Sequence, residues 1–261
     1  MRLAAGVEYQ GTGFAGWQSQ PHASSVQAEV EHALSMVADC PIKVICAGRT
    51  DAGVHGVGQV IHFDTTASRP PQAWVFGANA HLPASVSLRW VKPVPDDFHA
   101  RYNARSRRYR YLIHNSRTRT ALFADRACWY TYPLDAGRMQ EAARHLVGEH
   151  DFSSYRATEC QAKSPIRNVR EISVERRNNW VMIDVEANAF LHHMVRNIAG
   201  VLMMIGRGVQ EPGWTKDILL ARDRRAGGVT ADAEGLYLLL VRYDALYGIP
   251  APDLSASMML P

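Results

Sequence analysis

The sequence has 261 residues, of which 47% are hydrophobic and 21% charged. A chain of this length and composition forms one large domain or two small ones with a buried core, and none of its apolar runs approaches the roughly 20 residues that a membrane-spanning helix needs. The net charge at pH 7 is only +4, but it is unevenly distributed.

The chain carries no pattern of a secreted protein or of a cysteine-based metal site. Glu8 and Gln10 stand where a secretory signal would need an apolar run. The four cysteines lack the paired spacing that holds zinc or a redox disulfide. We therefore expect a cytoplasmic protein with reduced thiols, no metal and no contact with a membrane.

Residues 101–130 hold the excess positive charge. They contain eight arginines and one aspartate, with Tyr102, Tyr109 and Tyr111 interleaved. Such a block suits a polyanion whose bases stack on aromatic rings, although an arginine-rich strand edge that discourages aggregation has the same composition. Together with the loop at 47–63, described below, the block favours nucleic acid as the partner.

A strand, a glycine-rich loop and a helix are predicted first along the chain. Residues 3–9 are mostly apolar and predict a strand, and the loop at 11–16 lacks the spacing of a nucleotide-binding fingerprint. Ser24 and Gln27 predict a capping box for a helix whose apolar positions fall on one face. We expect that helix to cover one side of a sheet, and we expect no nucleotide cofactor.

Residues 47–63 contain a loop with unusual chemistry between two short apolar runs. The loop holds Arg49, Asp51 and several glycines. Glycine reaches positive φ without a steric clash, and a guanidinium beside a carboxylate keeps that carboxylate ionised. An ionised aspartate can act as a nucleophile or a base. The sequence Thr-Asp-Ala-Gly between two strands is also typical of an ordinary turn, and spacing alone favours the turn.

The next elements lead to a candidate boundary. Two prolines at 70 and 71 predict the start of a helix with Trp74 on its inner face, and residues 86–91 predict a strand. The prolines at 93–97 interrupt any strand ladder, so this stretch is a candidate boundary between domains.

The second half begins with a strand and a helix. Residues 107–113 alternate in a strand pattern, and Asp135 is the predicted cap of a helix with apolar positions on one side. The polar stretch at 148–165 predicts a long loop, which in a compact domain is usually functional or disordered.

A hairpin and a long helix follow. The hairpin covers 167–186 and turns at residues 178–179, and the helix covers 190–206. A polar stripe at helical spacing usually faces solvent, although it can also line a polar cleft. The polar stripe of this helix consists of His193, Arg196, Asn197 and Gly200.

The last predicted elements are a helix at 214–221 and a strand at 236–243. Strands and helices mix without regular alternation, which predicts an α+β fold with largely antiparallel sheets. We expect an N-terminal α/β half at 1–104, a C-terminal α/β half at 105–248 and a weakly ordered tail at 249–261.

Residues 48–55, Gly-Arg-Thr-Asp-Ala-Gly-Val-His, resemble the catalytic loop of the TruA-type family of tRNA pseudouridine synthases. The resemblance extends over nearly the whole chain, in the family's order. It implies the pseudouridine synthase fold: mixed, largely antiparallel sheets with helices on one face, in two similar halves around a central cleft. The further matching pieces lie at residues 16–18, 97–101, 107–111, 188–197 and 234–238.

The resemblance implies an isomerase that breaks the bond between uracil N1 and ribose, rotates the base and rejoins it through C5. Its substrate would be the anticodon stem-loop of tRNA, with targets at tRNA positions 38, 39 and 40. The target base would be flipped out of its stack. The enzyme would work as a homodimer, without a cofactor.

The resemblance also implies roles for individual residues. Asp51 would be the nucleophile, and whether it attacks ribose C1′ or uracil C6 is open. Tyr109 would stack on the target base and assist removal of the C5 proton, and Arg196 would keep the aspartate ionised. Leu236 would pack under the uracil, and Arg49 would occupy the position that the flipped base leaves.

Other arginines of the basic block would bind RNA without choosing its sequence. Arg101, Arg107 and Arg108 would hold phosphates and orient the RNA. An alternative hypothesis is a non-catalytic RNA-binding protein on the same scaffold, in which Asp51 only forms a turn.

Overall fold

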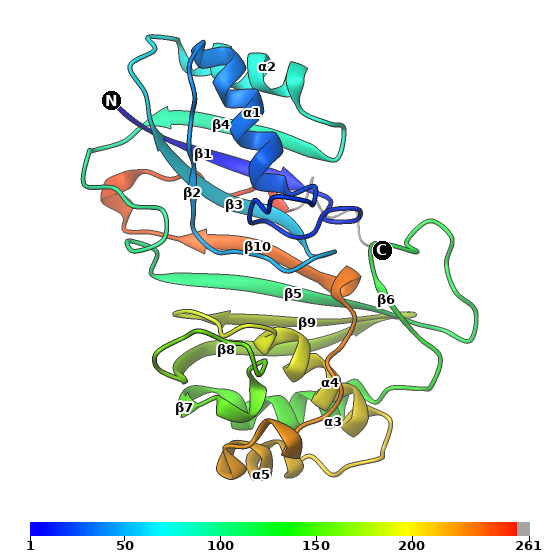
Figure 1. Cartoon of the computed structure of the whole chain (residues 1–261). Coiled ribbons are helices and arrows are strands. Elements are labelled where there is room, and N and C mark those ends of the chain that lie inside the picture. The colour runs from blue at the N-terminus through cyan, green and yellow to red at the C-terminus, as the bar shows by residue number, and fades with distance from the viewer. Residues whose placement is uncertain (255–261) are drawn as a thin grey trace. The chain divides into compact units, whose positions relative to one another are not determined.

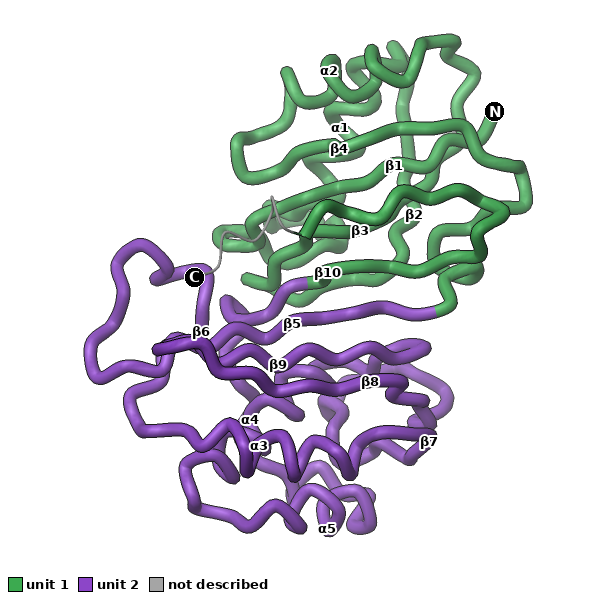
Figure 2. The backbone as a smooth tube through the Cα atoms, turned by 180° about the vertical axis from the view of Figure 1, so that it is seen from behind, with its two compact units in different colours: residues 1–105, 238–260 green, residues 106–237, 261 purple. Residues whose placement is uncertain are grey.

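The computed structural model describes residues 1–254 and divides the chain into two compact units (Figure 2). Unit 1 comprises Met1–Arg105 together with the described residues from Leu238 onward, and unit 2 comprises Ser106–Tyr237. Each unit combines a largely antiparallel sheet with helices, so the predicted α+β class is confirmed.

The expected halves, 1–104 and 105–248, differ from these units because the chain returns to unit 1 at Leu238. As a division into domains the halves stay a proposal. Of the expected tail at 249–261, the part beyond residue 254 lies outside the described residues.

Unit 1 consists of one sheet and two helices (Figure 1). Its elements are β1 (Arg2–Tyr9), α1 (Val26–Ala38), β2 (Ile45–Cys46), β3 (His55–Asp64), α2 (Pro71–His81), β4 (Val86–Pro93) and β10 (Leu236–Arg242), of which the first two residues belong to unit 2. The strand order is β4-β1-β3-β10, and β2 pairs with β3. Strand β1 is antiparallel to both of its neighbours.

Both helices of unit 1 cover the same face of its sheet. Leu3, Ala5 and Val7 alternate along β1 and are buried against Leu34 of α1 and Trp74 of α2. Because successive strand residues point to opposite faces, these positions fix which face of β1 meets the helices.

Helix α1 is confirmed, but its predicted capping box is wrong. Ser25, not Ser24, is the N-cap, and its hydroxyl accepts a hydrogen bond from the Ala28 amide at 3.3 Å. The Oε1 atom of Gln27 instead accepts a hydrogen bond from the Ser19 amide at 3.2 Å. The helix therefore starts one residue later, and the glutamine ties it to the preceding loop.

Unit 2 combines mostly antiparallel strands with three helices (Figure 1). Its elements are β5 (Ser106–Asn115), β6 (Cys128–Tyr130), α3 (Ala136–Ala143), β7 (Gly148–Asp151), β8 (Ile166–Arg177), β9 (Trp180–Ala187), α4 (Met194–Gly206) and α5 (Trp214–Ala221). The order β5-β9-β8-β7 is antiparallel throughout, and β6 pairs with β5 in parallel. Helix α3 packs on β8 and α4.

The predicted hairpin and the cap of α3 are confirmed. Arg177 pairs with Trp180 across the turn, where Asn178 takes a φ of 52° that asparagine tolerates better than most residues. The carboxylate of Asp135 accepts a hydrogen bond from the Arg138 amide at 3.0 Å, as a helix cap does.

Two predictions for unit 2 need correction. The stretch at 148–165 is not one loop, because β7 and a short 3₁₀ turn at Ser153–Tyr155 lie within it. The predicted helix at 190–206 begins only at Met194, because His193 has a left-handed φ of 60°.

Among the described residues, no helix combines the length and the apolar character that crossing a bilayer requires.

Candidate active site

Asp51 lies on the loop between β2 and β3 of unit 1, and the glycine-rich segment after β1 packs directly on that loop. The Trp17 amide donates a hydrogen bond to the Thr50 carbonyl at 3.0 Å. Gly16 has a φ of 99°, and a Cβ atom there would lie 2.7 Å from the same carbonyl oxygen. Only glycine therefore allows this close approach of the two backbones.

Buried polar side chains hold the same loop from the sheet. The hydroxyl groups of Tyr9 and Thr50 are hydrogen-bonded at 2.8 Å, and both residues are buried. The side-chain amide of Gln59, a fully buried residue of β3, donates to the Gly48 carbonyl at 2.6 Å. A buried polar group without its partner is costly, so these bonds fix the loop in one conformation.

The loop therefore presents a carboxylate and a guanidinium from a fixed backbone. The Val54 amide donates to the Asp51 carbonyl at 3.2 Å and closes the turn into β3. The Asp51 side chain is half-buried, whereas Arg49 is exposed. An anchored turn with a partly shielded carboxylate can serve as a nucleophile site.

The predicted uracil-binding residues Tyr109, Arg196 and Leu236 lie in unit 2, and Tyr109 belongs to β5. Its ring is 8% exposed and packs edge-to-face on the ring of Phe190, with centroids 5.0 Å apart and planes at 83°. The sequence pattern placed Phe190 on the apolar stripe of a helix. Since that helix starts at Met194, Phe190 belongs to the preceding loop, where it fixes the tyrosine ring.

Arg196 is anchored near the start of α4. Its Nε atom donates to the Ala231 carbonyl at 2.8 Å, and the Ala231 amide donates back to the Arg196 carbonyl at 3.2 Å. Burial raises the pKa of Glu234 above its usual range, and the positive charge of Arg196 opposes that rise. The charges of Arg196 and Glu234 therefore interact. Leu236, two residues after Glu234, is 5% exposed.

The segment that anchors Arg196 also contacts β5, the strand of Tyr109. The hydroxyl of Tyr111 donates to the Asp232 carbonyl at 2.9 Å. A Cβ atom on Gly235 would lie 2.8 Å from the Tyr111 ring, so the segment follows the strand closely. The elements of unit 2 that carry Tyr109, Arg196 and Leu236 are therefore in contact with one another. They are strand β5, the start of α4 and the segment from Ala231 to Leu236.

The polar stripe of α4 faces protein, so the solvent-facing interpretation is wrong for two of its members. Asn197 is 1% exposed, and its Nδ2 atom donates to the Tyr155 carbonyl at 2.8 Å. Its Oδ1 atom accepts from the Thr230 hydroxyl at 2.6 Å. A Cβ atom on Gly200 would lie 1.8 Å from the Val229 carbonyl oxygen, so only glycine lets that segment cross the helix.

The predicted RNA-binding arginines have different environments. Arg108 and Arg110 both pair with the buried carboxylate of Asp184, at 3.0 and 2.6 Å. The hydrogen bond to Asp184 raises the pKa of Arg110. Arg107 is half-buried and donates to a backbone carbonyl, whereas Arg101 of unit 1 is exposed. The basic block is therefore partly neutralised inside the protein.

Other arginines of the block are exposed in the segment between β5 and β6, which also carries Leu122 at 83% exposure. They are Arg117, Arg119 and Arg126. The prediction for the basic block included these arginines without naming them, because composition does not separate an arginine that pairs internally from one that faces solvent.

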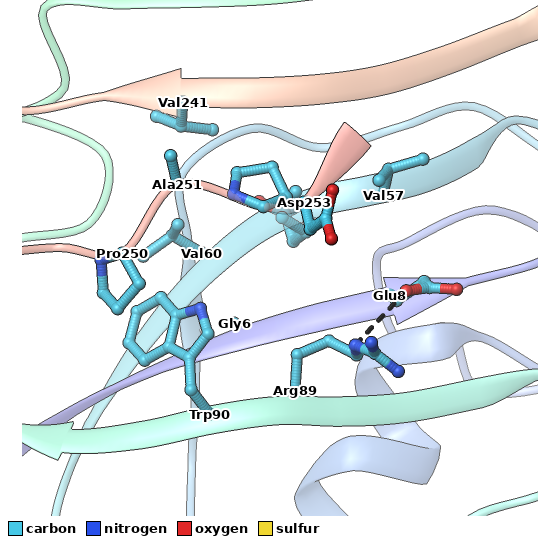
Figure 3. Close-up of a pocket in the computed structure, with 13 residues that line it drawn as sticks. Gly6, Glu8, Val57, Val60, Arg89, Trp90, Val241, Pro250, Ala251 and Asp253 are labelled. Carbon is cyan, nitrogen blue, oxygen red and sulfur yellow. Dashed lines mark ion pairs between the residues drawn. The ribbon is translucent and has the colours of Figure 1, made fainter. Parts of the chain in front are cut away.

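A cavity of about 170 Å³ lies on the other face of the unit 1 sheet, beneath the chain at residues 250–253 (Figure 3). The Trp90 ring forms one wall over Gly6, where a Cβ atom would lie 2.2 Å from the indole Nε1 atom. Beside it, Arg89 pairs with Glu8 at 3.4 Å. None of the predicted site residues lines this cavity, so it is separate from the candidate active site.

Comparison with known proteins gives consistent matches over most of the chain. A family model described as tRNA pseudouridine synthase matches residues 5–103 and 142–244. The tRNA pseudouridine synthase A of Nitrosococcus oceani is 55% identical over 250 residues, covering 96% of both chains. The proteins of the same name from Enterobacter sp. (strain 638) and Photobacterium profundum are 53% and 52% identical. They cover 97% of this chain and 94% and 97% of their own.

The family match includes Asp51, Arg196 and Leu236, whereas Tyr109 lies between its two matched segments. Among solved structures, one titled "Crystal Structure of a Cbf5-Nop10-Gar1 Complex" is similar, with a TM-score of 0.37 and 14% identity. It covers 77% of this chain and 45% of that chain. A likeness this distant carries no argument about the active site.

Proposed function

Because this chain belongs to the tRNA pseudouridine synthase family, and is therefore an isomerase that converts uridine to pseudouridine in tRNA, we propose that Asp51 is its nucleophile. The observation that carries the proposal is 52–55% identity, over nearly the whole chain, to relatives named for this activity. Residues 48–55 also resemble the family's catalytic loop. The anchored backbone of that loop supports the role, because catalysis needs a positioned nucleophile.

The reaction exchanges one bond to the ribose for another. The bond between uracil N1 and ribose C1′ breaks, the base rotates, and a bond forms between C5 and C1′. The C5 atom loses a proton and N1 gains one, so atoms and charge balance without an external oxidant or group donor. A carboxylate nucleophile can begin by attacking ribose C1′ or uracil C6, and Asp51 suits both routes.

We assign the uracil-binding roles to residues of unit 2. Tyr109 stacks on the target base and assists removal of the C5 proton, and its ring is already fixed by Phe190. Arg196 takes the role of the basic residue that keeps the family's nucleophile ionised, supported by its anchored guanidinium. Leu236 packs under the uracil, in keeping with its small exposure.

RNA contacts belong to arginines on both units. Arg49 takes the position of the flipped uridine, which its exposure on the loop allows. Arg101, Arg107 and Arg108 bind phosphates. Arg101 is exposed and therefore accessible to a phosphate. Arg108 is less accessible, because it shares the carboxylate of Asp184 with Arg110.

The finer assignments rest on the family resemblance alone. We place the target uridines in the anticodon stem-loop, and the enzyme in the cytoplasm as a homodimer. The non-catalytic alternative has no support, because the similar proteins are named as synthases.

The direct test uses a tRNA pool labelled with tritium at uridine C5. Formation of pseudouridine exchanges the C5 hydrogen, so the wild-type protein should release the label to water. Sequencing of pseudouridine in the treated pool should place it in anticodon stem-loops. Release without modification in that arm would contradict the target assignment, and no release at all would contradict the function.

A further inference from the structure

Three of the four tyrosines in the basic block, at positions 102, 109 and 111, differ sharply in exposure. Tyr109 and Tyr111 are 8% and 0% exposed, whereas Tyr102 is 76% exposed. A single exposed aromatic side chain is common and needs no explanation by itself. Tyr102 is distinguished by what lies beneath its ring.

Tyr102 forms the outer end of a column of three aromatic rings in unit 1. It stacks on His99, with ring centroids 4.2 Å apart and planes at 27°, and His99 lies 4.8 Å from His62 of β3. The amides of Arg101 and Tyr102 both donate to His99 Nδ1 at 3.2 Å. His62 is 3% exposed, so the column runs from the core to the surface and supports the outer ring.

Both imidazoles of this column are neutral near pH 7. Burial lowers the pKa of His62 to about 4 and also lowers the pKa of His99. Neutral rings stack without repelling each other, so the outer ring is supported near pH 7.

Positive charge lies beside the exposed ring. The Arg101 guanidinium lies 5.8 Å from the centroid of the Tyr102 ring. Burial raises the pKa of Cys46 in β2 to about 11, while the charges of Arg49 and Arg101 both oppose that rise. The charges of two guanidinium groups therefore reach β2, and such a region suits a polyanion.

We propose that Tyr102 is a stacking platform for a nucleobase of the tRNA substrate, with Arg101 on an adjacent phosphate. The proposal depends on the proposed function, since it names a further contact with the same substrate. His62 and the Asp51 loop lie at opposite ends of β3, roughly 20 Å apart at about 3.4 Å per residue. The stacked base is therefore not the reacting uridine but one several nucleotides away.

The test compares Tyr102→Ala with Tyr102→Phe, which keeps the ring. Loss of one stacked base should weaken tRNA binding by roughly 5- to 150-fold, so we expect Tyr102→Ala to raise both Kd and KM for tRNA. The kcat at saturating tRNA should stay at the wild-type value, and Tyr102→Phe should bind like wild type. Phe76→Ala, at a ring 73% exposed on α2, is the matched control and should have no effect.

A fluorescent base identifies the stacked nucleotide. With 2-aminopurine placed at successive positions of a tRNA anticodon arm, wild type and Tyr102→Phe should quench one position that Tyr102→Ala does not. Wild-type Kd and KM in Tyr102→Ala, while wild type releases tritium, would overturn the platform and leave the function intact. A change of oligomeric state with unchanged tRNA affinity would also overturn it, in favour of a protein contact.

Discussion

Single hydrogen bonds decide how firmly the Asp51 loop is held. The bond between the hydroxyl groups of Tyr9 and Thr50 is buried and joins the first strand to the residue before the aspartate. Neither hydroxyl has a role in the proposed chemistry. Their contribution is to hold the nucleophile in position, and the reaction rate depends on its orientation toward the substrate.

Tyr9→Phe removes that bond and keeps the ring. The Thr50 hydroxyl then loses a buried partner, so the free energy of unfolding should fall by about 1–3 kcal/mol. The kcat for tritium release should fall as well, because the loop loosens, while Kd for tRNA changes little. Urea unfolding and single-turnover kinetics measure the two effects.

Tyr243→Phe is the matched control, since it removes a hydroxyl that donates to the Ala100 carbonyl at 2.6 Å in the same unit. It should lower stability by a similar amount without lowering kcat. Equal losses of kcat in the two variants would contradict a specific role for the Tyr9 hydroxyl.

At the scale of elements, helix α4 and the segment that crosses it form one support for Arg196. Gly200 lies on the helix, and the Val229 carbonyl of the crossing segment occupies the space that a Cβ atom on residue 200 would need. Two residues further on, the same segment holds Arg196 through Ala231. The packing of the segment on α4 and the position of Arg196 therefore both depend on the contact between Gly200 and the Val229 carbonyl.

Gly200→Ala should break this support. Its Cβ atom would lie 1.8 Å from the Val229 oxygen, so the crossing segment must move and the free energy of unfolding should fall by about 2 kcal/mol. Gly213→Ala is the control, because its surroundings are open and its φ of −61° suits alanine. That variant should change stability by no more than about 0.5 kcal/mol. A Gly200→Ala variant as stable and active as this control would contradict the account.

Local patterns in the sequence identified most elements but not their exact ends. The apolar run at residues 3–9 and the cap at Asp135 are each signals within a few neighbouring residues, and both predictions are confirmed. Strand β7 was missed because its ordering comes from pairing with β8, a contact that local polarity does not reveal. The start of α4 depends on the backbone of His193, which composition does not encode.

The candidate site was predicted mainly from the family resemblance, and less from the spacing and chemistry of the residues. Spacing alone favoured an ordinary turn at Asp51 over a catalytic loop. The contact of Gly16 with the Thr50 backbone joins parts of the chain that are far apart in sequence, so no local pattern could identify it. Likewise, the pairing of Arg108 with Asp184 requires β5 and β9 to be aligned in register.

At the scale of the whole molecule, buried histidine links folding to pH. The pKa of His62 is near 6.5 in an unfolded chain and falls to about 4 in the folded protein, chiefly through burial. Between these values the unfolded state binds more protons, so stability falls as the pH falls. The contribution of neutral His62 is fully present above about pH 6.5 and is lost toward pH 4.

His62→Gln should flatten this part of the stability profile. The complete loss corresponds to about 3 kcal/mol, and glutamine can still accept the hydrogen bond that the Ala100 amide gives to His62 Nδ1 at 3.1 Å. Urea unfolding from pH 7 to pH 4.5 should therefore show a steeper decline for wild type than for the variant. Parallel profiles would show that His62 does not titrate with folding.

The most direct test of the central claim is tritium release from C5-labelled tRNA by Asp51→Asn, measured beside tRNA binding by the same preparation. The substitution keeps the size of the side chain and removes the nucleophile, so we expect release to be abolished while Kd stays close to that of wild type. Release at the wild-type rate, with mass spectrometry showing that the asparagine has not deamidated, would contradict Asp51 as the nucleophile.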